Sequence, residues 1–502
     1  MAKSPNAVAD IVVLGSGFAG SILALILQRQ GRDVLVIDKA SHPRFAIGES
    51  STPTANMVLA SLARQYDLPR LEPLSKYGTW RATYPQLTCG LKRGFSYFKH
   101  TLHTPFQPSD DHGHELLVAA NSDDRVSDTQ WFRSDVDAFL ATEAREVGIR
   151  LWEETDVDRL SPHCDGGWCL TGRRDGQPIE VTAPFIVDAS GAAGVVPRAI
   201  GIRDQQELCQ TNSRAVFGHF RNVASWEEMV AAQGCRTSDH PFPCDDAAQH
   251  QILDDGWMWL LRFENGVTSA GLVLDATRSP LDASLSPQAE WQQCLKRYPS
   301  LHQMFARATL VNPPGTLVRT GRLQRRFHRI VGSNWAALPH TAGFIDPLHS
   351  TGIAHSMCGV ERLAAILQQN WQRPTLPEAL VGYEASVLRE LDFIDQLVAA
   401  CYRGLTRFPL LVACSMLYFA AATTYEESRA AGDQGLDFLC ANNPELRAIV
   451  THLIARLSKV ESAADVEAFV DDLAVAIRPF NTVGLCNPAA RNMYHYTVAP
   501  EM

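Results

Sequence analysis

Strand-like and helix-like patterns alternate at the start of the chain. Residues 10–14 form a short apolar run, and over 21–30 the apolar residues recur at helical spacing. Gly31 ends this helical pattern, and a second apolar run over 34–37 stops at Asp38. The succession predicts a strand, a helix and a second strand, which together form the βαβ unit of a parallel sheet.

The pattern changes twice further along the chain. Residues 205–330 mix strand-like runs with turn-rich segments, and long helical patterns dominate from Leu376 to about residue 478. Before these regions we predict two extended segments, a helix and a buried strand, at 88–98, 116–119, 134–147 and 185–187. The order of elements predicts an α/β body, a β-rich insertion and a helical C-terminal part.

Composition narrows the class of protein. The chain has 502 residues, of which 46% are hydrophobic and 20% are charged, and this excludes a disordered chain, a collagen-like fibre and a coiled coil. The formal net charge is −10 without a block of basic residues, so we expect no nucleic-acid partner and no anionic membrane surface. The net charge does not indicate the substrate. The sequence does not indicate the oligomeric state.

Cysteine spacing and the longest apolar run bear on metals and membranes. The 12 cysteines are scattered without a C-x-x-C pair, so we expect no metal site and the reduced, buried thiols of a cytoplasmic enzyme. The apolar run from Leu410 to Ala422 is shorter than the ~20 residues that span a bilayer. We therefore expect no membrane-spanning helix.

A glycine-rich turn joins the first predicted strand to the first predicted helix. It reads Gly15-Ser-Gly17-Phe-Ala-Gly20, and its glycines allow the backbone to approach a pyrophosphate at the helix N-terminus. Asp38 ends the second strand, where its carboxylate can accept hydrogen bonds from a ribose. Because strand, helix, second strand and acid follow in order, we interpret the segment as a dinucleotide site.

A second loop, at 343–353, helps to identify the dinucleotide. It contains Asp346 and Pro347 and then Thr351-Gly352 before a helical pattern. Backbone N–H groups in such a loop can bind the polar edge of a flavin, or an anion. The same residues also suit an ordinary helix start with Ser350 or Thr351 as the cap. Together with the first turn, the loop favours FAD, and no second glycine-rich fingerprint indicates a separate NAD(P)H domain.

Several segments together resemble the flavin-dependent halogenases, and more loosely the wider group of FAD monooxygenases of the p-hydroxybenzoate-hydroxylase type. The segments that carry this resemblance are 15–20, 43–45 with 48–50, 89–98, 131–133 with Asp137, 188–191, 256–259 and 344–353. The resemblance covers roughly the first 375 residues, with gaps. It implies a Rossmann-like FAD-binding body of that type.

The resemblance also implies which residues hold the cofactors. Those matched to FAD are Gly15, Gly17, Phe18, Ala19, Gly20, Asp38, Lys39, Arg44, Gly48, Glu49, Ser50, Arg133, Val157, Asp188, Gly191, Asp346, Gly352 and Ile353. Thr351 and Gly352 match the positions whose amides hold chloride or bromide. In this family FADH2 comes from a separate flavin reductase that binds transiently, and it reacts with O2 and the halide to give hypohalous acid.

Because the flavin residues are spread along the chain, we expect one interleaved body rather than separate domains. The expected regions are a body over 1–375, a β-rich substrate region within it at about 80–130 and 205–330, and a helical C-terminal region over 376–502.

Lys92 is the candidate catalytic residue. In a regular strand over 88–98, Lys92 would share a face with Gly94 and Ser96, while Phe95 would lie on the other face. Small neighbours leave room for a ligand, and burial would lower the pKa of the amine. On spacing alone, the pattern favours a solvated strand lysine. The resemblance implies that Lys92 captures hypohalous acid, as a haloamine or by hydrogen bonding, and presents the halogen to the substrate.

Two departures from the family pattern concern the substrate and the reaction. After Trp257 and Trp259 the sequence continues Leu260-Leu261, where the family has Ile-Pro; the two tryptophans fit an active-site wall or a core. His349 stands where tryptophan halogenases have a glutamate. We therefore expect halogenation of an electron-rich phenol rather than tryptophan. The alternatives are a flavin-dependent aromatic hydroxylase of the same fold and a flavin-binding protein without turnover.

Overall fold

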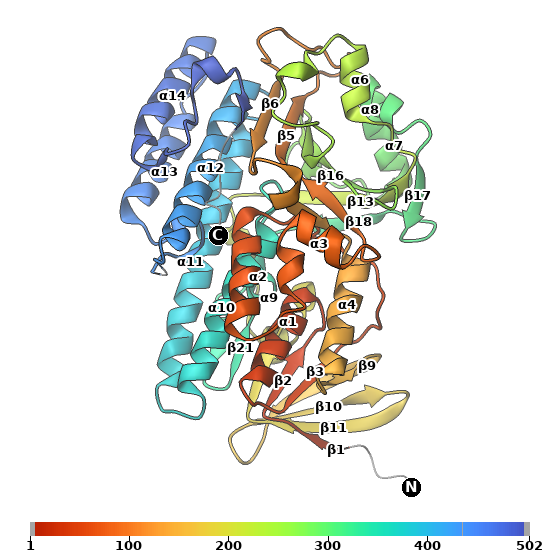
Figure 1. Cartoon of the computed structure of the whole chain (residues 1–502), viewed down its shortest axis with the longest axis vertical. Coiled ribbons are helices and arrows are strands. Elements are labelled where there is room, and N and C mark those ends of the chain that lie inside the picture. The colour runs from red at the N-terminus through yellow and green to blue at the C-terminus, as the bar shows by residue number, and fades with distance from the viewer. Residues whose placement is uncertain (1–5, 434, 496–502) are drawn as a thin grey trace.

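The computed structural model describes residues 6–433 and 435–495. A six-stranded sheet lies at its base, in the order β20-β21-β12-β2-β3-β8, and all neighbouring strands are parallel except β20 and β21 (Figure 1). Its strands are β2 (Ile11–Leu14), β3 (Val34–Ile37), β8 (Arg150–Trp152), β12 (Phe185–Asp188), β20 (Val331–Gly332) and β21 (Trp335–Ala337). Helix α1 (Phe18–Arg29) connects β2 to β3. The predicted βαβ unit is confirmed.

A nine-stranded sheet forms the upper part of the molecule, and its path runs β17-β13-β16-β15-β14-β5-β6-β23, with β18 beside β13 (Figure 1). Its strands are β5 (Gly94–Lys99), β6 (Glu115–Ala119), β13 (Ser213–Arg221), β14 (Ala247–Ile252), β15 (Gly256–Arg262), β16 (Val267–Asp275), β17 (Thr309–Asn312), β18 (Val318–Arg322) and β23 (Met493–Tyr494). The strands come from both regions expected to be β-rich. The end of the chain adds β23, which lies parallel to β6.

Both faces of this sheet are buried, against different partners. Phe95 and Tyr97 face the main hydrophobic core, whereas Phe98 faces a second core. The same alternation along β15 places Trp257 in the main core and Met258 in the second, as the two-residue period of a strand requires. The second core lies under α6 (Trp226–Ala232), α7 (Pro287–Arg297) and α8 (Pro299–Met304).

Three small sheets complete the body. β1, β11, β10 and β9 form one, and β4–β7 and β19–β22 form two antiparallel pairs. Their bounds are β1 (Asn6–Val8), β4 (Cys89–Lys92), β7 (Asp128–Trp131), β9 (Thr155–Pro162), β10 (Trp168–Arg174), β11 (Gln177–Ala183), β19 (Arg325–Arg326) and β22 (Gly343–Phe344).

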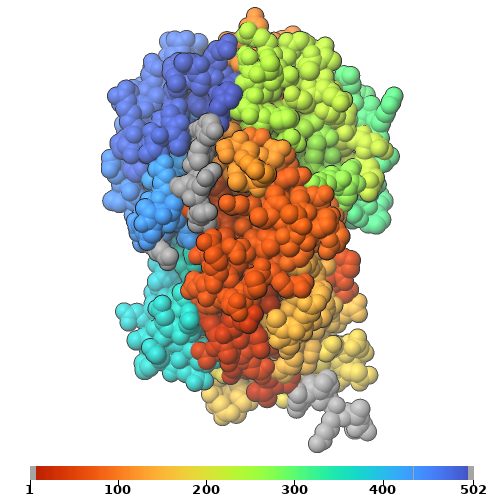
Figure 2. Space-filling view, in the orientation of Figure 1, coloured from red at the N-terminus to blue at the C-terminus, as the bar shows by residue number. Residues whose placement is uncertain are grey.

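Helices enclose the sheets. Those of the body are α2 (Pro53–Gln65), α3 (Tyr77–Thr83), α4 (Arg133–Glu146), α5 (Val195–Ala199), α9 (Pro339–Ala342) and α10 (Thr351–Asn370). Those of the C-terminal region are α11 (Leu376–Arg403), α12 (Phe408–Ala430), α13 (Pro444–Leu457) and α14 (Ala463–Ala476). The blue C-terminal segments lie beside the green segments in the upper part of the molecule, with orange segments below and between them (Figure 2).

Helix α12 is longer than the apolar run predicted. It has 23 residues and is long and apolar enough to cross a membrane, so the expectation that this segment is too short was wrong about its length. The helix continues through Thr423 and Glu426 to Ala430. It packs against α2, α11 and α14, and most of its apolar stretch is buried inside the protein. It serves here as a core helix.

The predicted single strand over 88–98 is two strands. β4 ends at Lys92 and pairs with β7, whereas β5 begins at Gly94 and pairs with β14 and β6. The break shifts the alternation of side chains, so that the Lys92 Nζ lies 4.1 Å from the centre of the Phe95 ring. The expected face shared by Lys92, Gly94 and Ser96 was therefore wrong.

Candidate functional site

The turn between β2 and α1 requires glycine at its first and last positions. A Cβ atom at Gly15, where φ is +106°, would lie 2.5 Å from the carbonyl oxygen of Ala189. A Cβ atom at Gly20 would lie 2.1 Å from the carbonyl oxygen of Gly15. Side chains would clash at both places, so glycine is what allows the turn to bring its backbone to the start of α1.

Asp38 faces this turn from the end of β3. Its Oδ2 accepts hydrogen bonds from the Ser16 amide and hydroxyl, both at 2.7 Å, and from Arg44 at 2.8 Å. The buried carboxylate therefore fixes the turn and one of the loops around it. Lys39, the next residue, is exposed and pairs with Asp156 at 3.1 Å.

A cavity of about 900 Å³ opens beside the glycine turn. The sequence-predicted residues that line it are Gly15, Gly17, Phe18, Ala19, Gly20, Asp38, Lys39, Arg44, Gly48, Arg133, Val157, Gly191, Gly352 and Ile353. These residues come from seven separate segments of the chain. The fold thus brings most of the predicted flavin residues to one elongated cavity.

Other predicted flavin residues lie behind the cavity wall. The Glu49 carboxylate is buried and lies 2.9 Å from Nε2 of His219. Asp188 accepts hydrogen bonds from Ser190 and from the Val196 amide, which shapes the loop after β12.

Asp346 and Ser50 are also set back from this cavity. The Asp346 carboxylate accepts hydrogen bonds from Ser213 Oγ at 2.6 Å and Tyr402 Oη at 2.8 Å, and burial raises its pKa to about 6. Ser50 is half-buried and forms an isolated bridge to Gln130.

Arg133 joins the first turn of α4 to the cavity. Its Nε and Nη2 donate to the two oxygens of Asp137, at 2.8 and 2.7 Å, and Nη1 donates to the carbonyl oxygens of Ile47 and Gly48. The guanidinium also lies over the Phe18 ring. This bidentate pairing holds a buried positive charge at the cavity wall.

The cavity also contains residues that the sequence analysis missed. His340, Phe344 and Ser356 line it, and burial lowers the pKa of His340 to about 3, so this imidazole is neutral. Ser356 stands four residues after Gly352 on α10, a spacing that places both on one helix face and that could have indicated it. Phe344 begins the 344–353 segment that carried the family resemblance, although it was not assigned to the cofactor, whereas nothing local in the sequence pointed to His340.

Helix α10 presents its N-terminus to the cavity. Ser350 is the N-cap residue, one of the two positions expected for an ordinary helix start, with φ of +53°, but its side chain makes no capping hydrogen bond. No described heavy atom lies within 4 Å of a Cβ built on Gly352. A small cavity of about 20 Å³, enough for one water-sized group, adjoins Thr351, Gly352, Asp346 and His355.

Lys92 is completely buried. Its Nζ donates a hydrogen bond to the carbonyl oxygen of Ser51 at 2.5 Å. Asp128 lies directly across the β4–β7 pair, and Glu426 approaches from α12. Burial lowers the pKa of Lys92 and raises that of Asp128, although each opposes the shift of the other.

The two carboxylates near Lys92 are held by the start of α2. Asp128 Oδ1 accepts a hydrogen bond from Asn56 Nδ2 at 2.6 Å. Glu426 Oε1 accepts from the Thr54 amide at 3.0 Å and from its hydroxyl at 2.8 Å. Burial raises the pKa of Glu426 to about 8. The lysine therefore sits in a dry, polar cluster in which small changes in charge matter.

The residues expected to form a substrate pocket are buried in an aromatic cluster. His349 stacks on Tyr418 with ring centroids 4.3 Å apart, and burial lowers its pKa to about 3. Trp257 Nε1 donates to Tyr402 Oη at 3.3 Å. Trp259 donates to Ser269 and covers Gly271, where an added Cβ would lie 2.2 Å from the indole.

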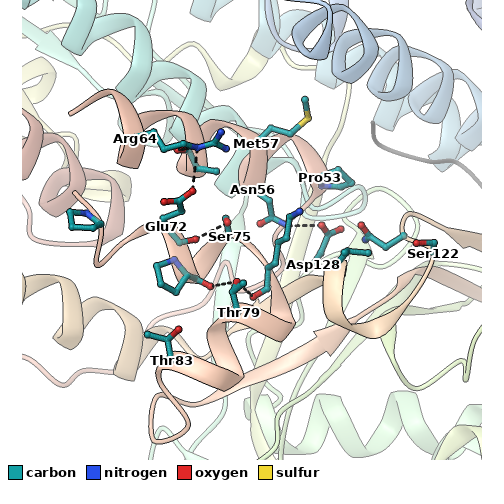
Figure 3. A pocket seen from close by; sticks show the side chains of 16 residues that line it. Pro53, Asn56, Met57, Arg64, Glu72, Ser75, Thr79, Thr83, Ser122 and Asp128 are labelled. Atoms are coloured by element: carbon teal, nitrogen blue, oxygen red, sulfur yellow. Dashed lines mark hydrogen bonds and ion pairs between the residues drawn. The ribbon is translucent and has the colours of Figure 1, made fainter. Parts of the chain in front are cut away.

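A second cavity, of about 440 Å³, borders the Lys92 cluster at Asn56 and Asp128. Figure 3 shows Pro53 and Asn56 of α2 on its wall, with Asn56 hydrogen-bonded to Asp128. Because Asp128 is paired with Lys92 across two strands, this cavity comes within one side chain of the lysine. The cavity is large enough for a small aromatic ring.

The cavity beside the glycine turn fits FAD. Its size lies within the usual range for cofactor sites, and it begins at a glycine turn with an acid at the next strand end. The open position at Gly352 and the N-terminus of α10 offer backbone amides at its other end. A side chain at Gly352 would enter the space that the cofactor needs.

Comparisons with known proteins agree with this geometry. A family model described as tryptophan halogenase matches residues 131–408, and one for an NAD(P)-binding Rossmann-like domain matches residues 13–69.

Curated relatives include two halogenases. The chain is 27% identical to monodechloroaminopyrrolnitrin halogenase PrnC of Pseudomonas fluorescens, over 98% of this chain and 90% of the relative. It is 28% identical to tetracycline 7-halogenase of Kitasatospora aureofaciens, over 80% of this chain and 71% of the relative.

Among solved structures, halogenase PltM in complex with phloroglucinol and FAD has the same fold, with a TM-score of 0.84 and 23% identity, over 97% of this chain and 99% of that chain. The halogenase family model spans more than half of the chain, which decides against both the hydroxylase and the protein without turnover. The chain belongs to the flavin-dependent halogenases and is an FAD-dependent enzyme that uses a halide.

Proposed function

We propose that this enzyme halogenates a phenol with hypohalous acid that passes from the flavin cavity to Lys92. The main support for this proposal is the buried hydrogen bond from Lys92 to Ser51, because Ser51 follows the loop whose Gly48 lines the flavin cavity. When bound, FADH2 from a separate reductase would supply the chemistry that converts O2, halide and a proton into hypohalous acid and water, with FAD as the other product. Lys92 then holds the hypohalous acid away from solvent.

Buried polar atoms without partners support a passage between the cavity and the lysine. Among the described residues, Gln130 is fully buried and neither its Oε1 nor its Nε2 has a hydrogen-bond partner. Gln130 and Asp128 alternate along β7 onto the same face, and Lys92 pairs with Asp128. Ser50, which bridges to Gln130, also has an unpartnered Oγ. These groups can hydrogen-bond to hypohalous acid on its way.

The halide site that we propose lies at Thr351 and Gly352. The first amides of α10 carry the positive end of the helix, and the adjoining cavity of about 20 Å³ has room for one small group. Chloride or bromide there would be next to the flavin cavity, because Gly352 lines both spaces.

A phenol suits the chemistry of the Lys92 cluster. His349 is neutral, so it offers no charge to activate an unreactive ring, whereas the hydroxyl of a phenol activates its own ring. Halogenase PltM has been crystallised with phloroglucinol, a phenol. We propose that the substrate enters the cavity beside Asn56 and donates its hydroxyl to Asp128, whose Oδ2 is buried without a partner.

The halogen transfer to the ring and the accompanying proton transfer can both take place within this cluster. A ring carbon bonds the halogen of hypohalous acid, and the oxygen–halogen bond breaks as hydroxide leaves. The ring carbon loses its proton, which passes through the buried carboxylates and joins the hydroxide as water. Lys92 presents the halogen, and Asp128 aligns the phenol.

Replacement of Lys92 by alanine tests the assignment. In K92A we expect oxidation of FADH2 by O2 to persist, while halogenated phenol measured by mass spectrometry falls by about 10²–10⁴-fold. Free hypohalous acid, measured with a chemical trap, should rise. K99A is the matched control, since Lys99 pairs with Asp254 in the turn after β14 and the variant should keep full activity. Halogenation retained in K92A would refute the role of the lysine.

A further inference from the structure

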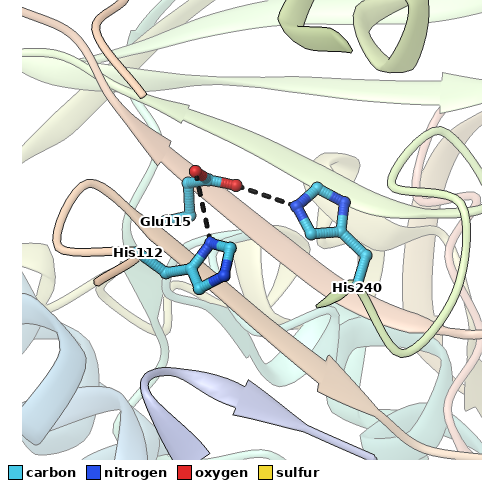
Figure 4. Close-up of side chains that lie close together, drawn as sticks. All are labelled: His112, Glu115 and His240. Atoms are coloured by element: carbon cyan, nitrogen blue, oxygen red, sulfur yellow. Dashed lines mark hydrogen bonds and ion pairs between the residues drawn. The ribbon is translucent and has the colours of Figure 1, made fainter. Parts of the chain in front are cut away.

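A second cluster of reactive side chains lies beneath β6, outside the site described above. It consists of His112, Glu115, Cys235 and His240, and all four side chains are buried. Figure 4 shows Glu115 between the two histidines, whose rings approach it from separate segments of the chain. The first two residues come from the start of β6 and the loop before it. The other two come from the segment after α6.

Several distances within the cluster are close to those between the ligands of a metal ion, and His112, Glu115 and His240 alone bring one ligand atom each within 4.8 Å of one another. His112 Nδ1 lies 3.6 Å from Glu115 Oε1, and Cys235 Sγ lies 3.2 Å from the same oxygen. His240 Nε2 lies 2.9 Å from Glu115 Oε2 and 3.8 Å from Cys235 Sγ. Ligands about 2.0–2.3 Å from a tetrahedral zinc ion lie roughly 3.3–3.8 Å from one another.

Outer carboxylates lie behind both histidines. Asp239 Oδ2 lies 3.2 Å from Nε2 of His112, which places the proton on that nitrogen and leaves Nδ1 with its lone pair facing Glu115. This Nδ1 is buried and has no hydrogen-bond partner in the described chain. Glu227 Oε2 lies 3.9 Å from Nδ1 of His240, which is beyond hydrogen-bond distance, and this nitrogen is buried without a hydrogen-bond partner in the described chain. A carboxylate behind each histidine is the usual surrounding of a zinc ligand.

We propose that His112, Glu115, Cys235 and His240 bind one zinc ion. Two imidazoles, a thiolate and a carboxylate form a donor set that zinc accepts, and four protein ligands leave no open position, so the site is structural. The Cys235 thiol gives up its proton to solvent as the ion binds. Sequence spacing predicted no metal site because the two halves of the cluster are far apart in the chain.

The zinc site joins three segments. Asp239, behind His112, lies 3.5 Å from Arg491, and Asn492 donates to the carbonyl oxygen of His112. The Asn492 carbonyl in turn accepts a hydrogen bond from the Leu117 amide in β6. The ion therefore holds β6, the 235–240 segment and the strand β23 together at the edge of the nine-stranded sheet.

Metal analysis of the purified full chain tests the proposal. We expect about one zinc per chain after dialysis, restored by Zn²⁺ alone after removal with a chelator. The chelated protein should melt several degrees lower. Reconstitution with Co²⁺ should give the visible bands of a tetrahedral ion and a thiolate-to-cobalt charge-transfer band. Co²⁺ spectra without a thiolate band, or a chain that binds no Zn²⁺, would overturn the proposal.

Variants assign the ligands. C235S and E115Q should lose bound zinc and the melting response to the chelator. Two matched controls should keep both: C244S removes the other thiol near His240, and C164S removes a thiol of an exposed His-Cys-Asp group. Loss of zinc in either control with retention in C235S would refute this set of ligands. Should C235S fail to fold, the cobalt spectrum of the unmodified protein still decides.

Discussion

Lys92 donates a hydrogen bond through Nζ to the carbonyl oxygen of Ser51, and this contact joins the catalytic candidate to the loop that borders the flavin cavity. The carbonyl holds the end of a long, flexible side chain in one place. Since Ser51 also pairs with Thr129 of β7, hydrogen bonds connect the loop to both strands of the small sheet.

The pH dependence of halogenation should follow the charge of Asp128. In D128N the Lys92 amine loses a negative neighbour, so its pKa falls further. We expect the apparent pKa that Lys92 contributes to the pH–rate profile to move to lower pH. A shift of the acidic limb means that the neutral amine reacts, as a haloamine requires. A shift of the alkaline limb means that the ammonium acts by hydrogen bonding.

The control for D128N has to take account of the other charged groups near Lys92. Glu426 also faces the amine, and Lys92 in turn lowers the pKa of His250. D124N removes an exposed carboxylate of the same region that pairs with Arg93, and its profile should match that of the unmodified enzyme. An unchanged profile in D128N would contradict the coupling.

Gln130 should matter for halogenation more than for folding. Replacement by leucine removes two buried polar atoms without partners, so we expect Q130L to be as stable as the parent or up to about 1–3 kcal/mol more stable. Its halogenated product should fall, while free hypohalous acid rises. Urea denaturation and a hypohalous-acid trap measure the two effects. A stable variant with full halogenation would exclude Gln130 from the passage.

Glu426 should make stability fall as pH rises. Its pKa is about 8 in the folded protein and 4.5 when exposed, so between these values unfolding releases a proton. This contribution to stability is complete below pH 4.5 and is lost as pH rises through 8. E426Q keeps an acceptor for Thr54 without the charge, so it should gain on the parent by up to roughly 1.4 kcal/mol per pH unit in that window. Urea midpoints from pH 5 to 8 measure the difference, and parallel curves would contradict it.

A side chain at Gly352 should displace FAD. The Cβ of G352V would enter open space at the cavity wall, where the cofactor needs room, and we expect at least about tenfold weaker FAD binding. G382V is the control, because Gly382 also has open space around it but lies exposed on α11. Fluorescence titration with FAD compares the two, and equal affinities would show that Gly352 does not face the cofactor.

The parts of the fold that depend on neighbours in sequence could be predicted. Gly15, Gly20 and Asp38 predict the βαβ unit because the turn, the helix start and the strand end each depend on residues close in sequence. The structure places all three residues at one cavity. The break after Lys92 could not be predicted, since it comes from tertiary pairing. A Cβ at Gly94 would lie 2.0 Å from the Val118 carbonyl, so β5 must turn to pair closely with β6.

The partners of Lys92 show the same limit. Nothing in the sequence distinguishes Asp128 and Glu426 from other acidic residues. Asp128 lies on a strand, and Glu426 lies at the polar end of an apolar helix. Only the packing of α12 over α2 buries them beside the amine. His112 and His240 are likewise separated in sequence, and the sheet edge brings them together.

The pairing of β23 with β6 has a consequence for biosynthesis. Met493 and Tyr494 are made after every other strand of the nine-stranded sheet, so this edge of β6 stays unpaired until residues 493 and 494 have left the ribosome. An unpaired edge strand is a template for association with other chains. A chain truncated before residue 493 should therefore aggregate more than the full chain.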